Sequence, residues 1–223
     1  MNEGIIPDVS FNDNSSQRTP CVLVLDGSGS MGGAPIEQLN EGLQLLESAL
    51  KEDPTTALRV QLLVIRAGGL DQVEILTDWT DAIDFQAPTV QANGTTPLGA
   101  AMNLALEKVE QQKAAYDANG ISSTRPWVIL ISDGSPTDPG WDLVAERCRL
   151  AENNRKLIVF PIGTEGAILE NLGAFSNMGP KKLKGLQFKE LFVWLSRSMA
   201  TVSVSSPGER VQLPATNWAE VEV

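Results

Sequence analysis

The order of hydrophobic and polar positions along the chain predicts strands and helices in alternation. Continuous apolar runs, which are typical of strands buried on both faces, occur at residues 21–25, 58–66, 126–132 and 156–162. Amphipathic stretches with helical spacing occur at residues 34–52, 98–109, 141–153 and 188–202. Strands that alternate with helices form a mostly parallel sheet covered on both sides. We therefore expect an α/β fold with a doubly wound, Rossmann-like sheet.

Shorter patterns complete the expected domain. Residues 72–76 predict a short antiparallel edge strand, because only Gly68-Gly69 separate this run from the preceding strand. Residues 78–87 are expected to form a less regular connection. Residues 168–175 predict a short helix, and residues 181–183 are a candidate short edge strand.

The two ends of the chain differ in composition from its centre. The polar residues 1–17 favour a flexible N-terminal arm, which leaves residues 18–202 as the domain. Residues 203–223 are expected to form an extended C-terminal tail. This tail is polar apart from Val211, Leu213 and Trp218, so packing against the domain and mobility are both open.

The loop after the first strand carries the strongest chemical signal. Four apolar residues, 22–25, run directly into Asp26-Gly27-Ser28-Gly29-Ser30. The loop presents one carboxylate and two hydroxyls at alternate positions, and oxygen ligands suit a hard cation such as Mg²⁺ or Mn²⁺. Ordinary turns also use these residue types. However, Asp133 follows another core strand, and topology brings the carboxyl ends of parallel strands to one edge of the sheet.

Composition narrows the possible functions. The net charge of −11 argues against a nucleic-acid or anionic-membrane partner, because phosphates attract basic surfaces. The absence of histidine excludes Ser-His-Asp sites and the usual zinc sites. Cys21 and Cys148 are expected to be buried free thiols. We find no apolar leader or membrane-spanning run, so a cytoplasmic location is expected.

The combination of motifs resembles a known family. Asp26-Gly27-Ser28-Gly29-Ser30, Thr96 before Pro97, and Asp133-Gly134 resemble the metal-ion-dependent adhesion site of von Willebrand factor type A (vWA) domains. The resemblance implies that the Ser28 and Ser30 hydroxyls bind the metal directly. It implies that Thr96 binds directly or through water, and that Asp26 and Asp133 act mostly through water. Thr95 is the alternative for the threonine role.

The resemblance extends to the bacterial TerY-like proteins associated with tellurite resistance. It rests on residues 18–21, 94–99, 132–138 and 192–198, which are spread along most of residues 18–213. The resemblance implies a scaffold or regulator in a stress-response system, in some cases beside kinase-like and phosphatase-like neighbours.

These observations favour a binding module over an enzyme. We expect a metal site that docks an acidic residue of a protein partner, with the oligomeric state left open. The alternatives are a metal-dependent phosphohydrolase, or a regulator of a kinase/phosphatase pair. The enzyme is the weaker hypothesis, because Ser28 stands where such phosphatases place a second Asp and no basic clamp lies nearby. Asp138 is expected to cap the helix that follows it or to support the metal site.

Overall fold

A seven-stranded sheet with helices on both faces forms the domain in the computed structural model, which describes residues 14–70 and 72–220. The strand order is β3-β2-β1-β4-β5-β6-β7. The strands are β1 (Thr19–Gly27), β2 (Val60–Gly68), β3 (Gln72–Asp81), β4 (Trp127–Ser132), β5 (Ile158–Gly163), β6 (Lys181–Leu183) and β7 (Ala219–Glu220). The helices are η1 (Gly29–Met31), α2 (Ala34–Glu52), α3 (Pro54–Arg59), α4 (Leu98–Ala118), α5 (Trp141–Asn153), α6 (Leu169–Gly173) and α7 (Phe188–Ser203).

The centre of the sheet is parallel, as the alternating pattern predicts. β1 pairs in parallel with β2 on one side and with β4 on the other, and β4 pairs in parallel with β5. All nine residues of β1 are buried, because helices cover both faces of the strand. The predicted fold class is therefore confirmed.

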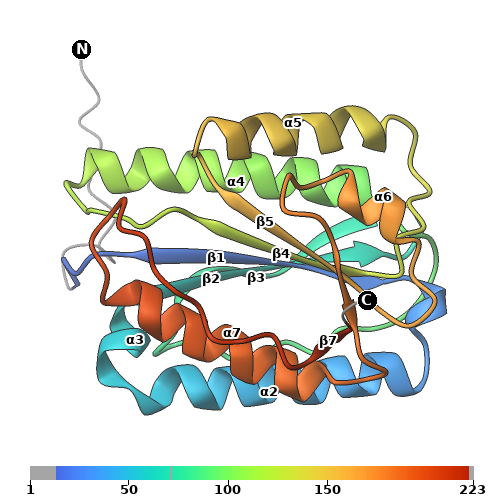
Figure 1. Ribbon diagram of the computed structural model, residues 1–223, viewed down its shortest axis with the longest axis horizontal. Helices are drawn as coiled ribbons and strands as arrows, with labels where there is room; N and C mark the ends of the chain where they lie inside the picture. The colour runs from blue at the N-terminus through green and yellow to red at the C-terminus, as the bar shows by residue number, and fades with distance from the viewer. Residues whose placement is uncertain (1–13, 71, 221–223) are drawn as a thin grey trace.

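Two helical layers enclose the sheet (Figure 1). Helices α2, α3 and α7 lie against one face, and α4, α5 and α6 lie against the other. Alternate residues of β1 enter separate cores: Leu23 and Leu25 pack with α2 and α7, whereas Val22 and Val24 pack with α4 and α5. The period of two along the strand thus divides the apolar residues between the two layers.

The second strand and its neighbour differ from their predicted bounds. Residues 54–59 form the helix α3 instead of leading directly into the strand, because Asp53 accepts a hydrogen bond from the Thr56 amide (2.8 Å) and Pro54 occupies the first turn. β3 continues to Asp81, well beyond the expected residue 76. Its register with β2 shifts twice near Val64, and such bulges break the period-two pattern by which a strand is recognised.

The segment after α7 returns to the domain as far as the structure describes it. β7 pairs antiparallel with β6, and Trp218 is only 1% exposed. The Trp218 ring lies 5.4 Å from that of Trp194, whose indole nitrogen donates a hydrogen bond to the Pro214 carbonyl (2.9 Å). Of the two possibilities left open for these residues, packing against the domain is therefore the one observed.

The remaining expectations concern the N-terminus, the thiols and the membrane. The predicted arm falls largely on residues 1–13, which lie outside the described residues, while Gln17 donates a hydrogen bond to the Ser205 carbonyl (2.8 Å). Cys21 and Cys148 are buried and free, as predicted, and burial raises the pKa of each thiol to about 12. No helix in the described ranges is both long and apolar enough to cross a membrane.

Replacement of Trp218 tests whether the C-terminal return stabilises the domain. Trp218→Ala removes a fully buried ring from the core on the α7 face, and we expect a loss of about 3 kcal/mol or more in the free energy of unfolding. The measurement is chemical denaturation followed by circular dichroism. Val204→Ala is the control, because Val204 lies in the same segment but is 63% exposed. Equal stability of the two variants would contradict a structural role for the return.

Candidate metal centre

Asp26 is placed at the carboxyl end of β1 and is fully buried there. One carboxylate oxygen accepts a hydrogen bond from the Ser28 amide (2.8 Å), and the other accepts one from the Ser132 hydroxyl at the end of β4 (2.5 Å). Burial raises the pKa of Asp26, the negative charge of Asp133 raises it further, and the bonds from Ser132 and Ser28 oppose the rise. The carboxylate therefore fixes the loop between two neighbouring strands and contributes negative charge beneath it.

The two serine hydroxyls of the loop are joined to each other, and Ser30 joins them to Asp133. The Ser28 and Ser30 hydroxyl oxygens lie 2.9 Å apart, and the Ser30 hydroxyl hydrogen-bonds to the Asp133 carboxylate. Asp133 directly follows β4, and its second carboxylate oxygen accepts a hydrogen bond from the Ser135 amide (3.1 Å). Four of the five sequence-predicted residues are thus linked to one another by hydrogen bonds at a single edge of the sheet.

The fifth residue, Thr96, reaches the same edge on a loop held to both neighbours. The Gly29 amide donates a hydrogen bond to the Gly94 carbonyl (3.0 Å), which ties this loop to the serine loop. On its other side, the Thr96 carbonyl accepts a bond from the Thr137 amide (3.0 Å), and the Thr96 amide donates to the Thr137 hydroxyl (3.1 Å). Thr96 therefore lies on a segment fixed between the two loops that carry Ser28 and Asp133.

The side-chain hydroxyls of the two candidate threonines, Thr95 and Thr96, differ in their hydrogen bonding. The Thr95 hydroxyl donates a hydrogen bond to the Gly69 carbonyl (3.3 Å). The hydroxyl of Thr96, a residue only 5% exposed, forms no hydrogen bond with the residues that the structure describes. Pro97, and not Thr96, occupies the N-cap of α4, so the Thr96 side chain is also not used as a cap.

Asp138 caps a different helix from the one that its sequence position suggests. Its carboxylate accepts hydrogen bonds from the Gly99 amide (3.2 Å) and the Ala100 amide (2.7 Å), which open α4. Two roles were expected for Asp138: a cap of α5, the helix that follows it in the chain, or support of the metal site. Because α4 begins directly after the threonine loop, this bond fixes the Thr96 segment to the loop that carries Asp133.

Arg66 is a buried positioning residue that sequence reasoning missed. Its guanidinium donates to the Gln91 carbonyl (2.8 Å), the Asn93 side-chain oxygen (2.7 Å) and the Gly27 carbonyl (3.3 Å). One side chain thus holds three acceptors, one at the end of β1 and two in the segment before α4, which matches the rigid fork of a guanidinium. A charged residue at the end of the apolar run of β2 was the available signal.

The chemistry of the donor set fits a hard divalent cation. It consists of three hydroxyl and two carboxylate side chains, all with oxygen donors, at one edge of the sheet. No cluster of three or more His, Cys, Asp or Glu side chains with metal-ligand spacing occurs in the described part of the chain, so a carboxylate-rich or thiolate site is not found there.

Fold and site together define an open α/β domain with a hydroxyl-rich loop at the carboxyl edge of its sheet. The chain belongs to the von Willebrand factor type A domain family, whose model matches residues 21–187. No curated protein matches the sequence. The resemblance of the motifs to von Willebrand factor type A domains is therefore confirmed at the level of the domain family.

Solved structures share the fold at low sequence identity. A von Willebrand factor type A protein from Catenulispora acidiphila is 15% identical, with a TM-score of 0.61 over 83% of this chain and 43% of that one. The pilus adhesin SpaC from Lactobacillus rhamnosus GG is 14% identical, with a TM-score of 0.63 over 84% and 32%. The manganese-loaded TRAP protein of Plasmodium vivax is 18% identical, with a TM-score of 0.52 over 81% and 73%. The chain thus spans less than half the length of the first two.

Close backbone packing between loops can be tested at Gly94. A Cβ on Gly94 would lie 1.6 Å from the Gly69 carbonyl oxygen, and the residue has a φ of +72°. Gly120 has a similar φ of +68°, but a Cβ there would have no neighbouring atom within 4 Å. We expect Gly94→Ala to lower the free energy of unfolding by at least ~2 kcal/mol more than Gly120→Ala, because only the first adds a clash to the backbone strain. Thermal and urea unfolding measure the difference, and equal losses would contradict the loop packing.

Proposed function

We propose that this chain is a non-catalytic, metal-dependent protein-binding module. In this proposal Asp26, Ser28, Ser30, Thr96 and Asp133 hold Mg²⁺ or Mn²⁺, and an acidic side chain of a protein partner completes the coordination. The observation that carries the proposal is the hydrogen bond between Ser30 and Asp133, two residues 103 positions apart in the sequence. Turn residues with no common role have no reason to converge in this way.

The surroundings of the five residues indicate which of them would coordinate the cation directly and which would support those ligands. The exposed Ser30 and the unbonded Thr96 hydroxyl are suited to direct coordination, together with Ser28. Asp26 is already engaged on both carboxylate oxygens by Ser28 and Ser132, which suits a supporting role. When bound, the cation supplies positive charge for an incoming carboxylate, and neutral hydroxyl ligands leave that charge less compensated than carboxylates would.

Related proteins give partial support to this assignment. The TRAP structure of the same fold is manganese-loaded, and SpaC is a pilus adhesin. Both facts concern those proteins, and they are consistent with metal use and protein binding in this chain. We extend the proposal to a cytoplasmic role in a bacterial tellurite-resistance or stress-response system, which rests on the TerY-like motifs at residues 18–21, 94–99, 132–138 and 192–198.

Metal binding is the first test of the proposal. Isothermal titration of the full chain with MgCl₂ and MnCl₂ is expected to show one site, and Ser28→Ala and Thr96→Ala are each expected to weaken it by roughly tenfold or more. Thr95→Ala is the matched control, because its hydroxyl already bonds to Gly69. A greater loss in Thr95→Ala than in Thr96→Ala would reverse the threonine assignment, and unchanged binding in Ser28→Ala would remove the site.

Partner binding is the second test. The tagged chain is used to capture proteins from a lysate of its native host, either with Mg²⁺ or with EDTA. We expect a partner retained only with Mg²⁺ and lost in Asp26→Ala, while circular dichroism shows the domain still folded in EDTA. Binding that persists in EDTA would contradict metal-dependent docking. Hydrolysis of p-nitrophenyl phosphate by the wild type but not by Asp26→Asn would favour the phosphohydrolase instead.

A further inference from the structure

A cavity of about 570 Å³ lies at the opposite end of the sheet from the candidate metal centre. Residues that precede β4, the first residue of β5, the end of α5 and the segment after α7 form its walls. In Figure 1 the carboxyl end of β1 points to the right, whereas α5 ends at the left. The volume is within the range of small-molecule sites, and no residue of the cavity takes part in the metal centre.

Positive charge is concentrated in this cavity although the chain carries a net charge of −11. Its lining includes four cationic side chains and one carboxylate, namely Lys113, Arg125, Arg155, Arg210 and Glu209. None of the four cations forms an ion pair with the residues that the structure describes. Glu209 instead accepts a hydrogen bond from the Ser206 amide (2.8 Å). Uncompensated like charges repel one another, and an anion among them removes that cost.

Two polar groups on residues that line the cavity have no partner in the described structure. Arg125 donates from Nη2 to the Glu152 carbonyl (2.8 Å), but its Nε is buried without a hydrogen bond. Thr124, which is 5% exposed, has a buried hydroxyl that is also unbonded. Burial lowers the pKa of Arg125 and the nearby Arg155 lowers it further, against the charge of Glu152. Buried polar groups normally have partners, so these two indicate a ligand or ordered water.

Arg155 occupies a position that normally belongs to glycine. The Lys156 amide bonds to the Ala151 carbonyl (2.9 Å) and the Arg155 amide bonds to the Glu152 carbonyl (2.9 Å), which is the Schellman pattern that ends α5. Arg155 is the C′ residue of this pattern, with a φ of +55°, and it is the one non-glycine residue with positive φ in the described ranges. A long charged side chain at a position where glycine costs less suggests that the guanidinium has a function.

The floor of the cavity is apolar. Trp127 and Phe160 contribute to the lining, and their ring centroids lie 4.7 Å apart. Ile158, Val211 and Leu213 complete the apolar part. A ligand that fits both parts of the cavity therefore carries an anionic group next to an apolar body.

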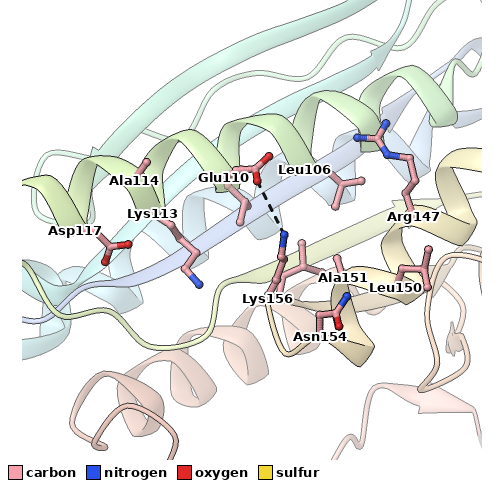
Figure 2. Close-up of a pocket in the computed structure, with 12 residues that line it drawn as sticks. Leu106, Glu110, Lys113, Ala114, Asp117, Arg147, Leu150, Ala151, Asn154 and Lys156 are labelled. Atoms are coloured by element: carbon pink, nitrogen blue, oxygen red, sulfur yellow. Dashed lines mark ion pairs between the residues drawn. The ribbon is translucent and has the colours of Figure 1, made fainter.

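The neighbouring groove between α4 and α5 has a different electrostatic character (Figure 2). There, Lys156 is directed at Glu110, with 4.0 Å between Nζ and the carboxylate, and Arg147 hydrogen-bonds to Asn103. Lys113, which lines both the groove and the cavity, points away from Glu110. One of the groove's three cations thus has an acidic partner, whereas none of the four in the cavity has one among the described residues, and this difference singles out the cavity.

We propose that this cavity binds a small organic phosphate, with the phosphate held by Arg125, Arg155 and Lys113 and the apolar body placed over Trp127 and Phe160. Four cations match a doubly charged anion better than a single carboxylate. A guanidinium group can also donate two parallel hydrogen bonds to two oxygens of one phosphate. The Thr124 hydroxyl provides a further donor.

Titration calorimetry of the full chain with AMP, adenosine and inorganic phosphate tests this site. AMP is expected to bind, inorganic phosphate to bind more weakly, and adenosine not to bind. Arg155→Gly is the decisive variant, because glycine is suited to the left-handed C′ position and keeps the fold. It is expected to weaken AMP binding by roughly tenfold while raising the thermal midpoint. Arg125→Gln is expected to weaken AMP binding to a similar degree.

Two matched controls separate the site from a general charge effect. Arg197→Gln removes one exposed positive charge from α7, outside the cavity, and is expected to leave AMP binding within about twofold. Arg155→Lys keeps the charge and is expected to retain part of the affinity. The proposal is overturned if no phosphate compound binds at millimolar concentration, if inorganic phosphate binds as tightly as AMP, or if Arg197→Gln weakens binding as much as Arg155→Gly.

Discussion

The parallel pairing of β1 with β4 is the constraint on which the candidate metal centre depends. Leu25 lies opposite Ile131 in this register, so Asp26 and Ser132 come next on neighbouring strands and form a hydrogen bond of 2.5 Å. A shift of one residue would exchange the two faces of β1, whose residues are buried in different cores. The same apolar packing that stabilises the sheet therefore also fixes the position of the oxygen donors.

A second set of hydrogen bonds, made by Arg66 and Asp138, then fixes the conformation of the loops at this edge of the sheet. Arg66 joins the Gly27 carbonyl to Gln91 and Asn93, and Asp138 joins the start of α4 to the loop that carries Asp133. These contacts are made largely to backbone atoms, so they fix the path of each loop without engaging the hydroxyls of Ser28, Ser30 and Thr96. Preorganisation of this kind lowers the free-energy cost of arranging ligands around a cation. In a flexible loop, that cost would reduce the affinity for the cation.

The sequence predicted the strands and helices of the centre well because their apolar runs are long and continuous. The prediction of element bounds failed where one motif was compatible with two structures, or where a bulge interrupted the pattern. Asp53-Pro54 ends one helix and begins another, and the bulges near Val64 disturb the alternation of the β2–β3 pair. The roles of Asp138 and Arg66 could not be assigned from the sequence, because each has a partner 39 positions away. The five candidate donors come from short motifs at the carboxyl ends of β1 and β4 and just before α4, and the structure brings these three segments to one edge of the sheet.

The two ends of the sheet present opposite chemistry, and the topology explains why they can differ. Loops at the carboxyl ends of the strands carry the hydroxyls and carboxylates, whereas the amino ends of β4 and β5 lie beside the end of α5 and the segment after α7. The strands between them are buried on both faces, so neither end has to accommodate the polar groups of the other. A strained Arg155 at one end costs stability without altering the register that aligns Asp26 with Ser132 at the other. The fold therefore keeps the candidate metal centre and the proposed phosphate cavity apart, at opposite ends of the sheet.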